Sequence, residues 1–189
     1  MRTSLALALL LWGTPGAAQR RHVETLEVGA AGVAAVGETY DGLWRAEPGG
    51  ALRVGTEFYG GQAHVDFHAF ANQPEEKGLP EFHAYRGEVG WGVRVGLPGR
   101  LRLVAGPAVG AVHYRFEPDE RFPMALQNET ELSLGLFARL DAPLLGPARV
   151  FAGAEVVRVY TAERIVYPFV EGGVALSTPA PRWLRRLLR

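Results

Sequence analysis

The sequence predicts an all-β chain that folds into an eight-stranded antiparallel up-and-down barrel. Three observations predict this class: apolar residues alternate with period two, the connections are rich in turn residues, and glycine and proline are abundant. The chain of 189 residues contains 24 glycines and 13 prolines. Each glycine inside a helix costs about 1 kcal/mol of stability, so a helical bundle is disfavoured. The length suits one domain of ordinary size.

The composition excludes several classes of function. Lys+Arg 20 balance Asp+Glu 20, so the chain lacks the bulk positive charge of a nucleic-acid-binding protein and we expect no nucleic-acid partner. Cysteine is absent, which excludes disulfide scaffolds, thiolate metal sites, cysteine catalysis and the lipid anchor of lipoproteins. No motif indicates a cofactor, and we expect none.

The N-terminus has the pattern of a secretory signal peptide. A basic start is followed by the apolar run 5–12 and by small residues before an expected cleavage after Ala18. As a helix, this run would span about 12 Å, against about 30 Å of hydrocarbon, so a membrane anchor is disfavoured. The expected division of the chain is a signal peptide at 1–18, a barrel at 19–178 and a basic amphipathic tail at 179–189.

Strict alternation is clearest in 62–71, 85–95 and 129–141. In 129–141, for example, four leucines and Ala138 at every second position oppose glutamate, serine, glycine and arginine. Alternation at 180° per residue places the two sets on opposite faces of a strand, and no helix face would collect them. Weaker alternation predicts five more strands at 23–35, 51–59, 101–115, 148–160 and 164–176.

The connections predict an antiparallel meander. Gly60-Gly61, 97–100 and 143–147 are short and turn-rich, which is typical of tight hairpins. Longer polar loops are expected at 37–49, 73–81 and 117–128, whereas the last hairpin, near Thr161, is short. Eight such strands close into a barrel, which removes the exposed edges of the sheet.

The composition of the polar face predicts which side of the wall faces inward. Glycine is frequent on this face, although a solvated strand normally carries Lys, Thr or Ser there, and its charges nearly cancel. A narrow interior explains both features, because enclosed charges must be paired. The residues expected to form an interior ion-pair network are Glu27, Arg53, Glu57, Asp66, Arg86, Glu88, Arg94, Arg102, Glu131, Arg139, Arg149, Glu155 and Glu171.

The apolar face is correspondingly expected to contact lipid. Its clearest members are Val65, Phe67, Val89, Trp91, Val93, Leu132, Leu134 and Leu136. Aromatic residues gather near the strand ends, as in the interfacial girdles of membrane barrels. The residues expected in these girdles are Tyr40, Trp44, Phe58, Tyr59, Phe82, Tyr85, Tyr114, Phe116, Phe122, Tyr160 and Tyr167.

With these patterns and short phrases such as Gly106-Pro107-Ala108-Val109-Gly110-Ala111-Val112-His113-Tyr114, the chain resembles the small eight-stranded outer-membrane β-barrels of the OmpA and OmpX type. The resemblance covers 22–177 and implies a transmembrane barrel in a bacterial outer membrane. One feature departs from the family pattern: many members end their last strand on an aromatic residue, whereas here Leu176-Ser177 and a tail follow.

The resulting expectation is a monomer that is integral to the outer membrane and has a structural or surface-interaction role. Its interior would be plugged by side chains and form no open pore. Its partners would be outer-membrane lipids and an unknown extracellular partner that contacts loops 37–49, 73–81 and 117–128. Two alternatives stay open: a soluble periplasmic lipocalin-like barrel whose apolar residues enclose an apolar ligand, and an outer-membrane lipid-modifying enzyme.

Catalytic and metal-binding patterns are weak. His64, Asp66 and His68 share one strand face, but strand geometry separates the two histidines by about 13 Å, so they could not share an ion without other strands. An ion pair of Asp66 with Arg86 or Arg53 is the preferred interpretation. Ser133 has no evident histidine partner. We therefore expect neither a metal site nor an enzyme.

The C-terminal tail differs from the rest of the chain. After two prolines, apolar and basic residues follow at helical spacing, which is typical of a short amphipathic helix lying in an anionic membrane interface. A frayed, solvated terminus is equally compatible with so short a segment. The residues expected at the interface are Arg182, Trp183, Arg185, Arg186 and Arg189.

Overall fold

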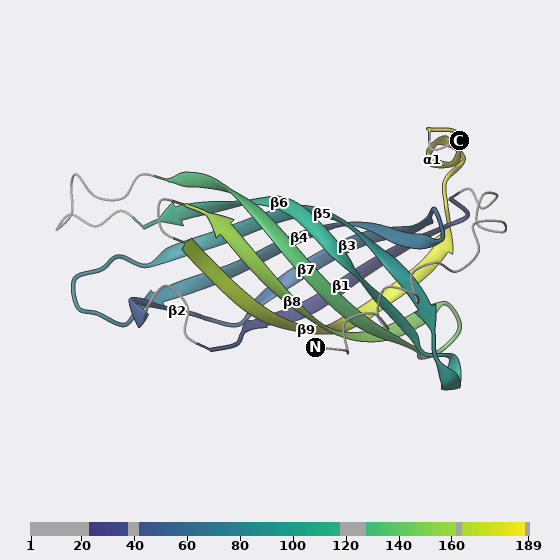
Figure 1. Cartoon of the computed structure of the whole chain (residues 1–189), viewed down its shortest axis with the longest axis horizontal. Helices are drawn as coiled ribbons and strands as arrows, with labels where there is room; N and C mark the ends of the chain where they lie inside the picture. Colours follow the sequence, from purple (N-terminus) through teal and green to yellow (C-terminus); the bar gives the residue numbers. More distant parts are fainter. Residues whose placement is uncertain (1–22, 38–41, 118–127, 162–163, 188–189) are drawn as a thin grey trace, which may run out of the picture.

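The computed structural model describes residues 23–37, 42–117, 128–161 and 164–187, and most of them lie in β-strands (Figure 1). The signal peptide expected at 1–18 lies outside the described residues. The elements are β1 (Thr25–Ala35), β2 (Trp44–Ala46), β3 (Gly49–Phe58), β4 (Gly61–Pro74), β5 (Phe82–Gly96), η4 (Pro98–Arg100), β6 (Arg102–Phe116), β7 (Glu129–Pro143), β8 (Ala148–Tyr160), β9 (Arg164–Pro179) and α1 (Arg182–Leu187).

The strands close into an antiparallel barrel. Their order is β2-β4-β3-β1-β9-β8-β7-β6-β5, and β5 pairs back onto β4. Both β2 and β3 pair with β4, so they act as one wall strand interrupted at Glu47-Pro48; proline has no N–H for the ladder. The wall therefore has eight strands, and pairing of β1 with β9 joins the two ends of the meander. The predicted eight-stranded up-and-down barrel is confirmed.

Short turns occupy one end of the barrel, and the longer connections, together with the short connection between β8 and β9, occupy the other. Tyr59 and Gly60 form a two-residue turn with positive φ angles of 47° and 73°, as hairpins with the usual strand twist require. The prediction placed this turn one residue later, but Gly61 already begins β4. We call the end with residues 59–60, 97–101 and 144–147 the turn end. The opposite end, which includes β2, is the loop end.

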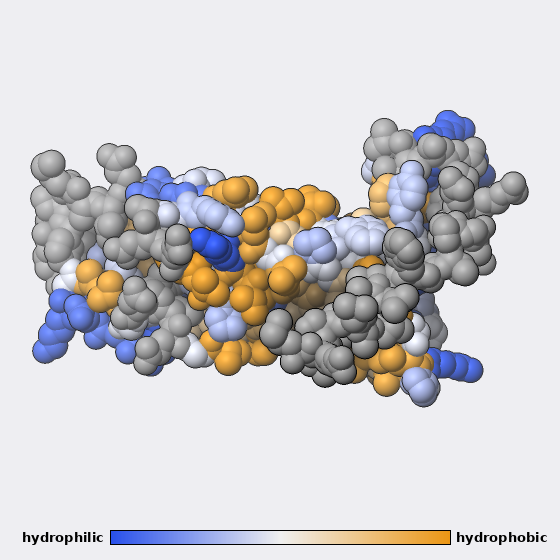
Figure 2. Space-filling view, viewed as in Figure 1, coloured by the Kyte–Doolittle hydropathy of each residue, from blue (hydrophilic) through white to orange (hydrophobic). Residues whose placement is uncertain are grey.

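The outer surface of the wall is apolar. Leucine and valine side chains point outward along every wall strand, among them Leu52 at 62% exposure and Leu136 at 69%. Figure 2 shows hydrophobic residues gathered over the middle of the barrel, with hydrophilic residues nearer its ends. Among the described residues, no helix is long and apolar enough to cross a membrane.

The loop-end half of the interior is an apolar core. Phe70, Phe82, Tyr114, Tyr167 and Phe169 are its large members, and each is at most 8% exposed. Aromatic rings contact one another here, such as Phe82 and Tyr114 at 5.7 Å between ring centroids. The hydroxyl groups of Tyr114 and Tyr167 are 2.9 Å apart.

This core corrects the predicted aromatic girdles. Phe82, Tyr114 and Tyr167 are buried inside the barrel, and Trp44 and Phe116 pack against them. Among the other candidates, Tyr59 and Tyr160 are exposed, at 72% and 43%. Tyr40 and Phe122 lie outside the described residues. The physical reason for the difference is the length of the strands: they continue far enough toward the loop end for inward-facing positions to need apolar filling.

Two strands approach each other so closely at Gly110 that this position needs a residue without a side chain. A Cβ at Gly110, on β6, would overlap the Gly87 carbonyl and the Glu88 backbone of β5. A Cβ at Gly87 would meet nothing within 4 Å. Gly110 therefore permits the close approach of β5 and β6 on the inner face of the wall.

We expect Gly110→Ala to lower the free energy of unfolding by about 1–3 kcal/mol, because the added methyl forces the strands apart. The matched control Gly87→Ala should change it by less than about 0.5 kcal/mol. Urea unfolding of the refolded barrel in detergent micelles measures both. Equal effects of the two substitutions would contradict the close approach.

Candidate functional site

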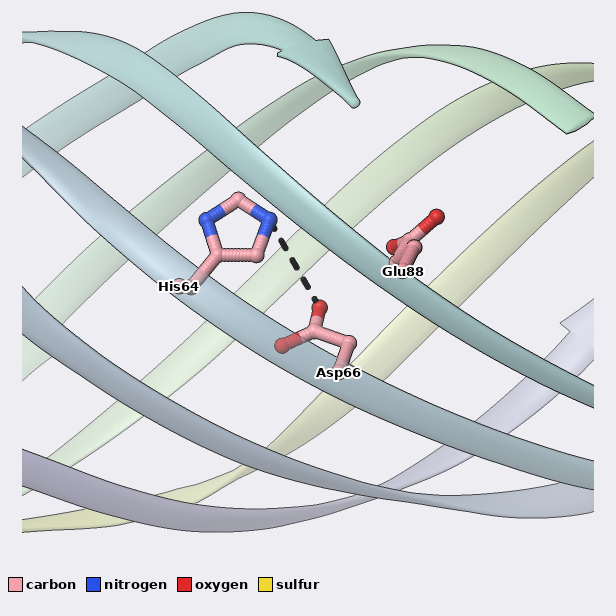
Figure 3. Close-up of side chains that lie close together, drawn as sticks. All are labelled: His64, Asp66 and Glu88. Atoms are coloured by element: carbon pink, nitrogen blue, oxygen red, sulfur yellow. Dashed lines mark ion pairs between the residues drawn. The ribbon is translucent and has the colours of Figure 1, made fainter. Parts of the chain in front are cut away.

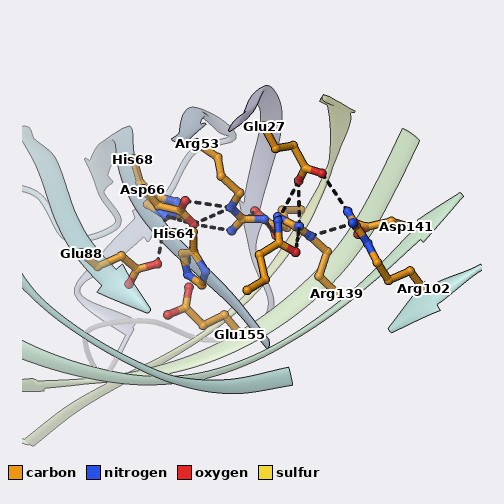
Figure 4. Close-up of polar contacts among 12 residues, drawn as sticks. Glu27, Arg53, His64, Asp66, His68, Glu88, Arg102, Arg139, Asp141 and Glu155 are labelled. Carbon is orange, nitrogen blue, oxygen red and sulfur yellow. Dashed lines mark hydrogen bonds and ion pairs between the residues drawn. The ribbon is translucent and has the colours of Figure 1, made fainter. Parts of the chain in front are cut away.

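The middle of the barrel interior holds a network of charged side chains (Figure 4). Arg53 on β3 lies beside Asp66 on β4, its direct cross-strand partner. Its Nε donates to both Asp66 oxygens, at 2.7 and 2.8 Å, and its Nη1 donates to Glu171 on β9 at 2.9 Å. One guanidinium thus joins three strands, which its fork of donors suits.

A second group lies closer to the turn end. Arg102 donates to Asp141 and to Glu27, both at 2.7 Å. Arg139 lies 3.0 Å from Glu27 and 2.8 Å from Asp141. These two arginines and two carboxylates form a neutral ring, which we call the turn-side ring. Gln62 donates to Glu27 and accepts from Arg139, both at 3.0 Å.

Arg86 on β5 is the centre of a third group. Its Nη2 lies 3.1 Å from His68 Nε2 and 3.3 Å from Glu88 Oε1, and it donates to Glu155 on β8. Arg86 is 1% exposed. All three contacts reach Nη2, whereas Nε and Nη1 are buried without a hydrogen-bond partner among the described residues. The neighbouring carboxylates therefore compensate for the removal of this charge from water.

Aromatic faces complete the surroundings of the arginines. The guanidinium carbons of Arg53 and Arg139 lie 5.5 and 5.3 Å from the centroid of Phe151. Arg86 lies 5.3 Å from the centroid of Phe169. Such cation–π contacts strengthen when the charge is desolvated.

The structure brings most of the predicted network residues together. All of them except Glu131 and Arg149 form an ion pair with another described residue. Glu57 and Arg94 pair near the turn end, where both remain about one-third exposed. Asp66 pairs with Arg53 and forms no ion pair with Arg86 among the described residues.

Sequence reasoning missed Asp141, Gln62 and the histidines as members of the network. Asp141 shares the inward parity of Arg139 in the strand expected at 129–141, so its inclusion could have been inferred. The histidine spacing also needs correction. Both imidazole Nε2 atoms lie within 4.0 Å of Asp66 Oδ2, because the side chains lean toward each other from backbone positions that are farther apart.

The residues predicted to contact lipid all lie on the outer face. Their exposed fractions run from 38% for Trp91 to 69% for Leu136. The soluble alternative, in which Val65, Phe67, Val89, Trp91, Leu134 and Leu136 line an internal cavity, is therefore wrong. Ser133 is buried at 1% exposure and forms no hydrogen bond to a histidine in the described part of the chain.

Arg139→Leu should lower the free energy of unfolding by about 3–5 kcal/mol, because Glu27 and Asp141 would then share one guanidinium in a buried ring. Arg45→Leu is the control, since the ion pairs of Arg45 with Glu47 and Glu75 are exposed. That change should cost at most about 1 kcal/mol. Both are measured by urea unfolding, and a loss for Arg139→Leu no larger than for Arg45→Leu would mean that the interior is well hydrated.

The fold is similar to solved structures of small barrels. Neisserial surface protein A superposes with a TM-score of 0.58 at 12% identity, over 80% of this chain and 95% of that chain. Ail, the attachment invasion locus protein of Yersinia pestis, gives 0.51 at 14% identity, over 84% and 100%. A major outer membrane protein from Thermus thermophilus gives 0.52 at 13% identity, over 83% and 100%. No family model and no curated protein matches the chain, so these likenesses concern the fold alone.

Proposed function

We propose that the chain is an integral outer-membrane β-barrel protein with a structural or surface-interaction role. The observation that carries the proposal is the inside-out distribution of polarity: apolar side chains cover the middle of the outer wall, whereas most inward-facing charged side chains are enclosed and paired. In water, so large an apolar surface would be unstable and prone to aggregate. In a bilayer it is the surface that contacts acyl chains.

The dimensions of the wall support the same proposal. A tilted strand of about 9–11 residues spans the hydrocarbon core. Of the wall strands, β3 has 10 residues and β9 has 16. The closed hydrogen-bond ladder also leaves no edge exposed to lipid. The signal pattern at 1–18 and the likeness to structures described as outer-membrane proteins favour the bacterial outer membrane over other membranes.

We further propose that the interior is closed. Charged groups fill its middle, and the aromatic core around Phe82, Tyr114 and Tyr167 fills its loop-end half. Eight strands leave room for side chains and no water-filled channel. Of the proposed partners, the acyl chains of the lipids would contact the apolar wall. We also propose that the protein acts as a monomer and has no catalytic activity.

The loop end is the proposed site of surface interactions, through the expected loops 37–49, 73–81 and 117–128. One Ail structure holds a heparin analogue, sucrose octasulfate. The connections 36–48, 75–81, 117–128 and 161–163 of this chain contain ten acidic and three basic residues. A polyanionic ligand is therefore disfavoured here, and a cationic partner suits this end better.

Substitution of Leu134 by arginine tests the membrane proposal. Leu134 lies on the outer face of β7 at 42% exposure, and Leu134→Arg should destabilise the barrel in lipid vesicles by about 2–4 kcal/mol. The control is Leu145→Arg, in the exposed turn between β7 and β8, which should cost less than about 1 kcal/mol. Normal folding of Leu134→Arg in vesicles would overturn the outward assignment of the apolar face.

For the tail we propose attachment to the headgroup region at the turn end. The short helix α1 follows β9, and Ser177 near the end of β9 donates to the Pro147 carbonyl of the turn 144–147 at 3.0 Å. Arg182, Trp183, Arg185 and Arg186 are at least partly exposed, whereas Arg189 lies outside the described residues. Cationic side chains beside an exposed tryptophan suit an anionic interface.

Fluorescence quenching distinguishes this placement from a solvated tail. In the mature chain carrying Trp44→Phe and Trp91→Phe, Trp183 is the one remaining tryptophan. Lipids brominated near the headgroup should quench it more strongly than lipids brominated deep in the acyl chain. Replacing Arg185 and Arg186 by glutamate should weaken that quenching. Quenching by aqueous acrylamide alone would instead show a solvated tail.

A further inference from the structure

Two carboxylates and an imidazole converge inside the barrel, where the arginine ion pairs leave the imidazole nitrogen without a hydrogen bond among the described residues. His64 and Asp66 come from β4, and Glu88 comes from β5 (Figure 3). One potential ligand atom from each lies within 4.8 Å of the others. The three side chains are at most 4% exposed. His64 Nε2 lies 3.8 Å from Asp66 Oδ2 and has no hydrogen-bond partner among the described residues.

Strand register explains this convergence. Asp66 is the direct cross-strand partner of Glu88, and Gly90 lies opposite His64. Like charges directly opposite each other destabilise a sheet, and each carboxylate has one arginine beside it, Arg53 at Asp66 and Arg86 at Glu88. The glycine opposite His64 leaves the space that its imidazole occupies, since a Cβ at Gly90 would overlap the ring.

A neighbouring set of potential ligands already has a cationic nitrogen among its members. His68, Glu88 and Glu155 also converge, but Nη2 of Arg86 contacts a nitrogen or oxygen of each of them. A guanidinium nitrogen thus takes the central position there. No guanidinium contacts His64 Nε2 among the described residues, so the His64 set is the better candidate.

The charge balance around these residues favours a further cation. Among the described residues, Arg53 and Arg86 are the arginines that form ion pairs with Asp66, Glu88, Glu155 and Glu171. With neutral imidazoles and all four carboxyl groups ionised, these carboxylates and the two guanidinium groups sum to −2, whereas the two arginines and two carboxylates of the turn-side ring sum to zero. A single dication would balance the group.

We infer that His64, Asp66 and Glu88 form a site for a divalent transition-metal ion, with Zn²⁺ as the best match. One imidazole nitrogen and two carboxylate oxygens are ligands that Zn²⁺ accepts, and water completes its coordination. Arg53 holds Asp66 in place by hydrogen bonds, as outer-shell partners of metal ligands do. The ion would join β4 to β5 in the middle of the wall. This inference does not depend on the membrane proposal, since it can be tested in micelles.

The experiment is refolding of the full mature chain in detergent micelles containing Zn²⁺, followed by desalting and measurement of zinc by mass spectrometry. We expect one Zn²⁺ per folded chain. His64→Ala and the nearly isosteric Glu88→Gln should each weaken binding by at least about tenfold. The control His83→Ala removes a histidine that pairs with Glu117 outside the interior and should leave the zinc content unchanged.

Co²⁺ gives a second readout, because its visible absorption bands report the ligand geometry. Wild-type protein should show these bands, and His64→Ala should lose them. Differential migration in SDS before and after boiling confirms that each variant has folded. Folded wild-type protein without bound metal would overturn the inference. So would metal that His64→Ala and Glu88→Gln retain but His83→Ala loses, since surface histidines would then be the ligands.

Discussion

Pairing of arginine with carboxylate inside a narrow cylinder is the constraint on which the rest of this structure depends. Arg53 binds Glu171, which is 118 residues away in sequence, and Arg139 binds Glu27 at a separation of 112. These contacts connect early strands with late ones, so they form only when the wall closes. Each charge enclosed without its partner would cost several kcal/mol. The network therefore makes closure of the barrel cooperative.

The interior of the barrel is filled by two different kinds of side chain along its length. Toward the loop end, aromatic rings exclude water by packing; in the middle, guanidinium groups lie over Phe151 and Phe169 while they bind carboxylates. Phe169 connects the two parts of the interior, because it packs in the aromatic core and its ring also faces the guanidinium group of Arg86.

The alternation of side chains predicted the eight wall strands and the barrel, and the glycines and balanced charges of the polar face predicted the outward position of Leu134 and Trp91. The same alternation also predicts the burial of Phe82, because Phe82 has the inward parity of Arg86. The aromatic residues near the strand ends suggested interfacial girdles instead, but the alternation of inward and outward positions was the better guide to burial. The partners of Arg53 and the opposition of Asp66 and Glu88 depend on strand register. Register is set across the whole ladder and cannot be obtained from a single strand.

The zero net charge of the chain conceals a separation of charge between its ends. The loop-end connections have an acidic excess, whereas the turns 59–60, 97–101 and 144–147 and the tail 180–189 contain five arginines and no acidic residue. Fixed charges at opposite ends of an apolar cylinder give it two distinct polar faces, so the two orientations in a bilayer differ in energy. Arginines at the turn end favour a leaflet with anionic headgroups. The acidic loop end then faces the opposite side, where cations or a basic partner would neutralise it.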